Sequence, residues 1–278
     1  MDGYRWWYEY SDLVSSAEDL ALGMLYHEQS KVSSANRALG QQQIEVPGIY
    51  EQYVMSRSFS AYGGASTIIL DIANENKAEI GQVLRNRRTP RNVAGPVTKL
   101  LLSAVLSDAL APTAVISKGE DTFLQMLRPW PSAGALYPID FYIIATEITG
   151  IPPAVYHYNI AENSLEPVAP HDPHSAQFKN SFLFSDVASQ APVIIVLVAC
   201  FDRTSAKYGA HRGYRLAMLD AGHASQTVLL AATGRGAVCI PLQGFSDDSL
   251  AEYIGVDGHR VAPVHTILLG HGTPTVSE

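Results

Sequence analysis

Apolar residues gather in a few unbroken runs in the second half of the chain, and these runs predict buried strands. Each run is rich in β-branched and aromatic residues, which favour strands, and carries few charges. Runs without alternation are typical of strands that are covered on both faces. The four runs are DFYIIATEI (140–148), APVIIVLVACF (191–201), AVCIPLQG (237–244) and HTILLG (265–270). Two further segments, AVYHYNI and SLEPVA, flank AEN at 161–163 and predict a hairpin.

Helices are predicted before and between these strands by apolar residues spaced three and four positions apart. We expect them over residues 13–28, 77–84, 96–110, 214–233 and 246–253. Pro96 suits a first helical turn, Pro112 a helix stop and Ser246 a helix start. One stripe of the fourth helix contains Leu216, Leu219, His223, Gln226 and Leu230. Gly234 is placed to cap the end of that helix.

The alternation of strands and helices predicts the fold class and the domain division. Strands interleaved with helices indicate an α+β fold, in which a mixed or antiparallel sheet packs against helices. Residues 4–43 are polar and aromatic by turns, and residues 47–64 have the scattered Pro, Gly and Tyr of a loop or arm. We therefore expect an N-terminal helical arm or extension over residues 1–76. Residues 77–278 then form the main domain. A chain of 278 residues is long enough to bury a sizeable core.

Composition and charge exclude several classes of function. The net charge of −8 argues against a nucleic-acid partner or a polybasic membrane anchor. The longest apolar run has ten residues by count of the sequence, too few for a membrane-spanning helix, and the N-terminus lacks the order of a secretory signal. Cys200 and Cys239 lack metal or redox spacing, so we expect buried thiols and no metal site. We therefore expect a cytoplasmic protein.

Arginines are concentrated in the segment RNRRTPR at residues 85–91. The whole chain has only 19 lysines and arginines, and four of them, Arg85, Arg87, Arg88 and Arg91, stand here. Guanidinium groups bind phosphate and carbonyl oxygens in a planar, forked geometry. The cluster predicts an anion site, although a solvated basic turn would also fit.

Two glycine-containing turns could bring backbone close to a ligand. In RPWPSAGALYPIDFYI, Pro131 precedes the small residues Ser132–Ala135, which would let a flat ligand approach the chain. A plain turn before a strand is the alternative. Gly244 follows a strand and precedes a helix, where a backbone N–H can meet an acceptor. An ordinary strand-to-helix turn explains Gly244 equally well.

The segment AKYGAHRGYR at 206–215 is unusually polar for the approach to an amphipathic helix. It carries Lys207, Tyr208, Arg212 and Arg215 within nine residues by count of the sequence. Surface helices rarely begin with so many polar groups, although a pair of solvated surface side chains would also explain Lys207 and Tyr208.

Taken together, these segments resemble the nitroreductase superfamily of FMN enzymes, and within it the azoline dehydrogenases, often called SagB-type. The resemblance runs from about residue 85 to residue 270. It is carried by RRTPR, PSAGALYPIDFYI, YGAHRGYRLAMLDAGHASQTVLLAATGRGA and IPLQGF, in that order. It implies the nitroreductase-like α+β fold, with a mixed and mostly antiparallel sheet packed by helices, and a homodimer with FMN in two interface sites.

The resemblance also implies which residues contact FMN. The arginines would hold its phosphate and the pyrimidine edge of its ring, the loop at 131–134 would reach it from the other subunit, and Gly244 would lie by N5. His271 stands where the family often has a phosphate-binding arginine, and His223 reads as a packed helix residue. The implied FMN contacts are Arg87, Arg88, Arg91, Pro131, Ser132, Ala133, Gly134, Gln226 and Gly244.

In azoline dehydrogenases a Lys-Tyr pair is the catalytic feature, and Lys207 and Tyr208 match it. Aromatising a thiazoline or oxazoline requires loss of a carbon-bound proton and of a hydride, with FMN as acceptor and O₂ as final oxidant. A partly desolvated lysine can act as the base. The implied partners are an azoline-containing peptide, ribosomal or carrier-bound, and a cyclodehydratase or peptide synthetase. An NAD(P)H-dependent nitro- or quinone reductase and a non-catalytic FMN subunit of a peptide-modifying complex remain alternatives.

Overall fold

The computed structural model describes most of the chain from residue 60 onward. The described residues are 22–23, 25–27, 30–31, 60–64, 66–71, 74, 78–118 and 123–272. Residues 22–23 and 25–27 are helical, as the prediction for 13–28 requires, and the rest of that predicted helix lies outside the described residues. Most of the predicted arm at 1–76 also lies outside them.

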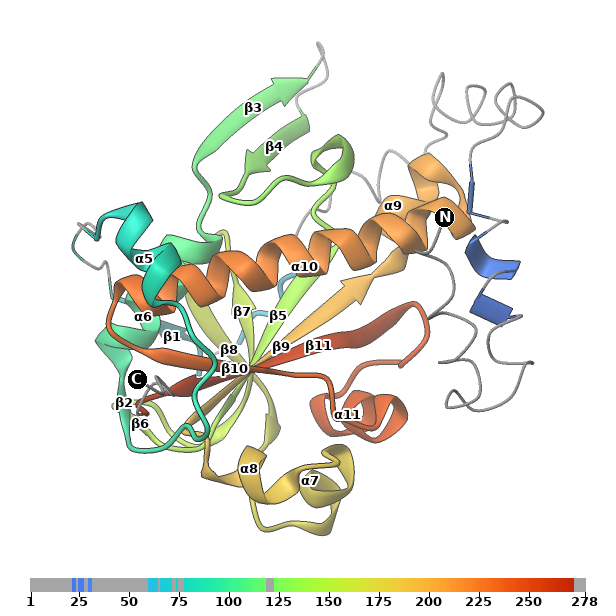
Figure 1. Cartoon of the computed structure of the whole chain (residues 1–278). Helices are drawn as coiled ribbons and strands as arrows, with labels where there is room; N and C mark the ends of the chain where they lie inside the picture. The colour runs from blue at the N-terminus through green and yellow to red at the C-terminus, as the bar shows by residue number, and fades with distance from the viewer. Residues whose placement is uncertain are drawn as a thin grey trace, which may run out of the picture.

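The central sheet has seven strands in the order β1–β8–β7–β5–β9–β11–β10 (Figure 1). Every neighbouring pair in it is antiparallel, which confirms the expected mostly antiparallel sheet. The predicted hairpin is β7–β8, where Asn159 pairs with Ser164. The bounds are β1 (Ile68–Ile69), β5 (Ile139–Ala145), β7 (Ala154–Asn159), β8 (Ser164–Pro170), β9 (Val193–Cys200), β10 (Val238–Leu242) and β11 (Val261–Gly270).

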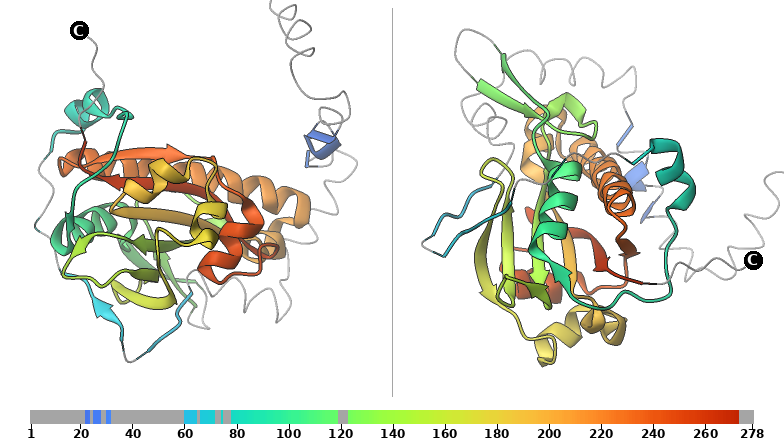
Figure 2. Two further views of the ribbon diagram at one scale, coloured as in Figure 1. Left: turned by 90° about the horizontal axis from the view of Figure 1, so that it is seen from below. Right: turned by 90° about the vertical axis from the view of Figure 1, so that its left-hand side faces the viewer.

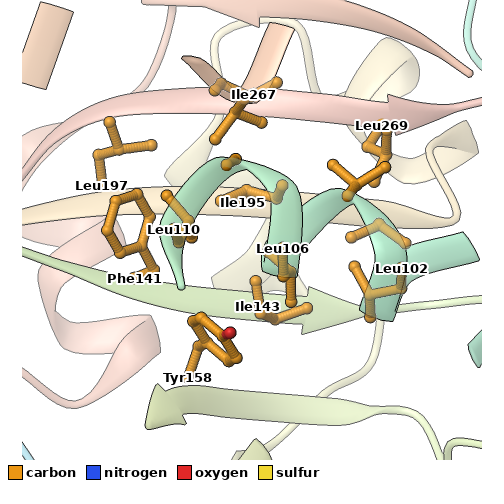
Figure 3. Close-up of a cluster of buried hydrophobic side chains, with 14 of the residues drawn as sticks. Leu102, Leu106, Leu110, Phe141, Ile143, Tyr158, Ile195, Leu197, Ile267 and Leu269 are labelled. Atoms are coloured by element: carbon orange, nitrogen blue, oxygen red, sulfur yellow. The ribbon is translucent and has the colours of Figure 1, made fainter. Parts of the chain in front are cut away.

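Helices cover both faces of this sheet (Figures 1 and 2). On one face lie α6 (Lys99–Leu110) and the long α10 (Ala210–Gly234), and on the other lie α7 (Ala176–Ser181), α8 (Ser185–Gln190) and α11 (Asp247–Ile254). Figure 3 shows part of the core between α6 and the sheet, where Leu110 lies beside Phe141 and Leu106 lies beside Ile143 of β5. The strands read as unbroken apolar runs because both of their faces are buried.

Smaller elements surround this framework. Helix α5 (Ile80–Asn86) lies beside α10, and a hairpin of β3 (Ala114–Lys118) and β4 (Phe123–Leu127) projects from the body (Figure 1). A short parallel pair joins β2 (Val97–Thr98) to β6 (Ile148–Thr149). A 3₁₀ turn, η1 (Ala133–Ala135), precedes β5, and α9 (Phe201–Tyr208) follows β9. The sequence patterns did not predict α7, α8, α9 or the β3–β4 hairpin.

The helix start predicted at 96 needs correction, whereas the one predicted at Ser246 is confirmed in position. The helix expected from 96 begins at Lys99, because Pro96 and the short strand β2 precede it, and the Thr98 hydroxyl accepts a hydrogen bond from Leu101 N at 3.1 Å. Ser246 does stand at the N-cap of α11. Its hydroxyl, however, donates to Ser249 Oγ at 3.0 Å and makes no capping bond to the backbone.

The end of α10 also differs from the prediction. Gly236, at φ +75°, terminates the helix, whereas the predicted cap Gly234 is still helical. Gly236 N donates to Thr233 O at 3.1 Å and Ala237 N donates to Ala232 O at 2.9 Å, the pair of bonds of a Schellman motif. A residue with a positive φ is needed one step after the C-cap, and glycine adopts it without strain.

The stripe predicted on α10 does not face the core. The buried face consists mainly of small residues, including Gly213, Ala217, Ala221 and Ala224. Leu219 is 54% exposed, and His223, which we expected to be packed, is exposed, as is Gln226. Small side chains let α10 lie close to the sheet, so the larger residues point outward. Among the described helices, none combines the length and apolarity that crossing a bilayer would need.

Candidate functional site

The order of the sheet brings three of the predicted site segments to one end. Ile139, which opens β5, pairs with Ala199 near the end of β9, and Cys200 pairs with Val261 at the start of β11. The loop before β5, helix α9 after β9 and the turn after β10 therefore leave the sheet on the same side. Pro131–Gly134, Lys207–Tyr208 and Gly244 lie in these three connections.

The loop at 131–137, which precedes β5, holds a strained backbone. Gly134, Ala135 and Tyr137 have φ values of +63°, +54° and +44°. Residues other than glycine adopt positive φ values only when the surrounding structure imposes them. Residues with this strained backbone cluster at functional sites. The Ser132 hydroxyl accepts a hydrogen bond from Tyr137 N at 2.9 Å, which closes the loop on itself. The loop is a preformed cradle of small residues.

Helix α10 anchors this loop through one buried and one exposed polar contact. Trp130 Nε1 donates to Asp220 Oδ1 at 2.7 Å, and Pro131 O lies 3.2 Å from His223 Nδ1. Burial raises the pKa of Asp220, and hydrogen bonds from Ser132 and Trp130 offset part of that rise. Neither Trp130 nor Asp220 was predicted as a site residue from the sequence. A carboxylate among small apolar residues of a helix was the available signal, because buried charges need partners.

Lys207 and Tyr208, at the end of α9, meet the loop at Gly134. A Cβ built on Gly134 would lie 2.8 Å from Tyr208 Oη and 2.9 Å from Lys207 Nζ. Lys207 Nζ lies 5.5 Å from the centroid of the Tyr208 ring. The Tyr208 phenol is protonated at neutral pH, and burial raises its pKa further above the usual value. The structure thus brings together three of the residues that the sequence singled out.

A buried ion pair holds α9 in place. Arg203 Nη1 and Nη2 donate to the two carboxylate oxygens of Asp140 at 2.8 and 2.9 Å, and Nη1 also donates to Tyr137 O at 3.1 Å. Burial opposes both charges. Their mutual attraction nevertheless lowers the pKa of Asp140 and raises that of Arg203, so both stay charged. Neither residue was predicted, although each flanks a buried strand, where a charge requires a partner.

Helix α9 and helix α10 approach closely at Gly213. A Cβ there would lie 2.7 Å from the Cα and N atoms of Ser205, and Thr204 Oγ1 donates to Gly213 O at 2.9 Å. The glycine in RGYR is therefore a packing requirement.

Arg212 Nη1 donates to Ser30 O at 3.5 Å, and Arg215 Nη2 donates to His27 O at 3.1 Å. These two arginines contact N-terminal residues of the chain.

The arginine segment lies at the opposite end of the sheet. Ala94, three residues after Arg91 in the sequence, forms a bridge with His271, just beyond the end of β11. A strand of ten residues spans about 30 Å, so this segment is far from α9. Figures 1 and 2 agree that α5 lies toward the C-terminal half of α10. The structure of one chain does not bring the arginines to Lys207.

The arginines instead share their end of the sheet with His271. Arg88 and Arg91 are exposed, Arg87 is half-buried and His271 is exposed. Strand β10 forms the adjacent edge of the sheet and runs for about 16 Å from this end toward Gly244. The arginines and His271 lie near the start of β10, and Gly244 lies beyond its end. An elongated anionic ligand along this edge strand could therefore reach both.

Gly244 packs against an exposed aromatic ring. A Cβ on Gly244 would lie 2.7 Å from Phe184 Cδ2, and Gly244 O accepts from Leu183 N at 2.9 Å. Leu183 and Phe184 are 72% and 58% exposed. Close packing by Phe184 therefore accounts for a glycine at this position.

The buried thiols expected at Cys200 and Cys239 are confirmed, and burial raises the pKa of both.

Several proteins are similar to this chain in sequence. A protein of Methanocaldococcus jannaschii described as a nitroreductase is 28% identical over 195 residues, which cover 68% of this chain and 91% of that protein. The microcin B17-processing protein McbC of Escherichia coli is 32% identical over 141 residues, 49% of this chain and 52% of McbC. The trifolitoxin-processing protein TfxB of Rhizobium leguminosarum bv. trifolii is 32% identical over 135 residues. The chain spans about half the length of McbC and 36% of TfxB.

Solved structures share the fold at low sequence identity. A nitroreductase-like protein from Anabaena variabilis superposes with a TM-score of 0.65 at 22% identity, over 88% of this chain and 45% of that one. A chain of the E. coli microcin synthetase McbBCD complex, solved with truncated pro-MccB17 bound, gives 0.57 at 20% identity, over 93% of this chain and 95% of that one. The nitroreductase family model matches residues 84–271, more than half of the sequence. The chain belongs to the nitroreductase family.

Proposed function

We propose that this protein is an FMN-dependent dehydrogenase that oxidises thiazolines or oxazolines of a peptide to thiazoles or oxazoles. The observation that carries the proposal is the position of Lys207 and Tyr208, whose polar atoms lie against Gly134 in a strained, small-residue loop. A reductase that only transfers hydride removes no carbon-bound proton, so it needs no base at this place. The 32% identity to McbC and TfxB, named as peptide-processing proteins, supports the same class of substrate.

The residues present are compatible with FMN. Arg87, Arg88 and Arg91 offer exposed or half-buried guanidinium groups to a phosphate in a chain of net charge −8, and His271 lies at the same end of the sheet. The backbone of the loop at 131–134 offers a surface that a flat ring can approach closely. Gln226, exposed on α10, and Gly244 complete the proposed contacts.

The two residues at the end of α9 have different proton-transfer roles in this proposal. The Lys207 amine removes the carbon-bound proton of the azoline ring. The phenol of Tyr208 is protonated at neutral pH, with a pKa that burial raises further, and it orients the ring by hydrogen bonding from Oη. Bound FMN supplies the hydride acceptor, and O₂ restores its oxidised form. The substrate loses one proton and one hydride in total, which leaves the aromatic azole.

A homodimer would assemble the complete site. The arginines and the Lys207–Tyr208 pair lie at opposite ends of one chain, so a second copy is needed to bring both to one ligand. Support comes from the outer face of α10, which exposes Leu219 and Tyr214. Light scattering should then show a dimer, and Leu219→Asp should produce monomers that lose FMN. A monomeric wild-type protein with full activity would contradict this arrangement.

The proposed substrate is a modified peptide, and an enzyme that forms azolines must act before this one. A cyclodehydratase or a heterocyclising peptide synthetase is therefore the proposed partner. The McbBCD complex, which is described with a truncated pro-peptide bound and contains a chain of the same fold, supports a partner of the first kind. Co-purification of the chain with a cyclodehydratase would test this association.

An NAD(P)H-dependent nitro- or quinone reductase is the second candidate. It is favoured by the relative from M. jannaschii, which aligns over 91% of its own length. Incubation of the purified yellow protein with a thiazoline peptide under air distinguishes the two candidates. The proposal predicts the mass loss of one hydrogen molecule from the peptide and formation of peroxide. Rapid bleaching of the flavin by NADH or NADPH, with no change in the peptide, would favour the reductase.

A further inference from the structure

Arg203 lies in the helix that carries Lys207 and contacts the loop that carries Gly134. Its Nη1 donates to Tyr137 O at 3.1 Å, in the strained loop that also contains Gly134. It also lies in α9, one helical turn before Lys207. Residues four positions apart lie on the same face of a helix. The Arg203 side chain therefore connects the loop at 131–137 to α9, the helix that carries the Lys207 amine.

The guanidinium of Arg203 is held from further directions. Asp140, at the start of β5, accepts from both of its terminal nitrogens, and Ser60 Oγ accepts from Nη2 at 3.0 Å. The Ser60 hydroxyl in turn donates to Asp140 Oδ2. Arg203 and Asp140 are only 5% and 3% exposed. A planar guanidinium whose donors are engaged in this way has little freedom to rotate.

Ser60 belongs to a short strap, residues 60–63, that has its own buried attachment. Tyr62 N and Gly63 N donate to the carboxylate oxygens of Glu166 at 2.9 and 3.1 Å. Glu166 is also 2.9 Å from His157 Nδ1 and accepts from Asn159 Nδ2 at 3.0 Å. The strap is therefore anchored at Glu166 and reaches Arg203 through Ser60.

We propose that Arg203 is the positioning residue for the Lys207–Tyr208 pair, and that Ser60 of the strap completes its hold. This inference rests on the proposed function, in which the pair acts on a carbon-bound proton. Small displacements of a catalytic group reduce the rate of the chemical step far more than they reduce binding. Loosening Arg203 should therefore lower kcat and leave KM almost unchanged.

Arg203→Lys is the most direct test, because lysine keeps the buried positive charge opposite Asp140. A single ammonium group does not reproduce the forked contacts to Asp140, Tyr137 and Ser60. We expect kcat for a thiazoline peptide to fall about 10- to 100-fold with KM and FMN content close to wild type. Arg260→Lys is the matched control. Arg260 pairs with Asp202 on the exposed side of the same helix, and its replacement should leave kcat unchanged.

Hydrogen exchange gives a readout that does not depend on turnover. In Arg203→Lys, amides of the loop at 133–137 and of α9 should both exchange faster, whereas Arg260→Lys should leave the loop unaffected. If Arg203→Lys does not fold, Ser60→Ala replaces it, with a fall in kcat of about threefold or more and unchanged thermal stability.

The inference is overturned by an Arg203→Lys protein whose kcat is within twofold of wild type, or by an equal loss in Arg260→Lys. For a misfolded Arg203→Lys, a wild-type kcat in Ser60→Ala overturns it. If the wild-type protein oxidises no azoline, the proposed function fails. Hydrogen exchange then still tests whether Arg203 connects the loop at 133–137 to α9. Unchanged exchange in both segments would then overturn the positioning role of Arg203.

Discussion

Tyr208 Oη lies 2.8 Å from the point that a Cβ on Gly134 would occupy, so the hydroxyl and the glycine backbone are in direct contact. Lys207 Nζ stands 2.9 Å from the same point. These residues are more than seventy positions apart in the sequence by count and meet because β5 and β9 are antiparallel neighbours. The candidate chemistry depends on this contact between a loop and a helix end.

Gly134→Ala tests the contact directly. The new methyl group would collide with both polar side chains, and alanine is strained at φ +63°. We expect azoline oxidation to fall at least about 10-fold and the free energy of unfolding to fall by about 1 kcal/mol. Gly255→Ala is the control, because Gly255 has φ +79° with no neighbour within 4 Å. It should show a similar loss of stability without loss of activity, and equal activity losses in the two variants would contradict the contact's role.

Replacement of Arg88 or Arg91 by alanine tests the anion site. Each charge-assisted hydrogen bond to a phosphate contributes about 1.5–3 kcal/mol, so FMN should bind about 10- to 100-fold more weakly. The measurement is the FMN dissociation constant from reconstitution of the apoprotein. Arg85→Ala is the matched control, since Arg85 belongs to the same cluster but not to the proposed contacts. If Arg85→Ala alone weakened FMN binding, the phosphate site would lie at Arg85, and the proposed contacts with Arg88 and Arg91 would be wrong.

Gly213→Ala tests the packing of α9 on α10. Its Cβ would meet backbone atoms of Ser205 at 2.7 Å, which flexible side chains cannot relieve. We expect a loss of about 1–3 kcal/mol in the free energy of unfolding measured with urea. Gly81→Ala, in α5, meets only the flexible end of Arg85 at 3.5 Å. Gly81→Ala should stabilise the protein by about 0.5–1 kcal/mol. A change of the same sign in the free energy of unfolding of both variants would contradict the prediction.

Stability should decrease as the pH falls from about 6.5 to about 4, partly because of His171. Burial lowers the pKa of this histidine to about 4, although Asp172 offsets part of the shift. The unfolded chain, with a histidine pKa near 6.5, binds the proton more readily in that window. His171→Gln should therefore reduce the pH dependence by about 1–2 kcal/mol, discounted for partial exposure. Urea titrations at several pH values measure it, and an unchanged slope would contradict the prediction.

The fold could be predicted where the pattern was dense in information. Continuous apolar runs gave β5, β9 and the end of β11, because burial on both faces removes polar residues from a strand. The run of β10 was also recognised, although this edge strand is mostly half-buried. The helix α9 was missed because FDRTSAKY has few apolar residues. Its helical state depends on tertiary contacts such as the Arg203–Asp140 pair. The buried face of α10 was assigned wrongly because alanines, which form it, carry a weak hydrophobic signal.

The candidate site was only partly predictable. Lys207, Tyr208 and the loop at 131–134 were identified through motifs, and their meeting at Gly134 required the strand order of the sheet. Trp130, Asp220 and Arg203 were missed, because a sequence gives no partner for a buried polar side chain. The distance between the arginines and Lys207 could not be predicted either, since it depends on which strand ends share an edge.

Lys207→Ala measured against a thiazoline peptide tests the central claim most directly. The account predicts a yellow protein with wild-type FMN content and cooperative unfolding that forms no detectable thiazole under air. Lys207→Arg, which keeps a cation but no accessible base, should be equally inactive. Thiazole formation by Lys207→Ala at the wild-type rate, or a colourless wild-type protein that takes up no FMN, would contradict it.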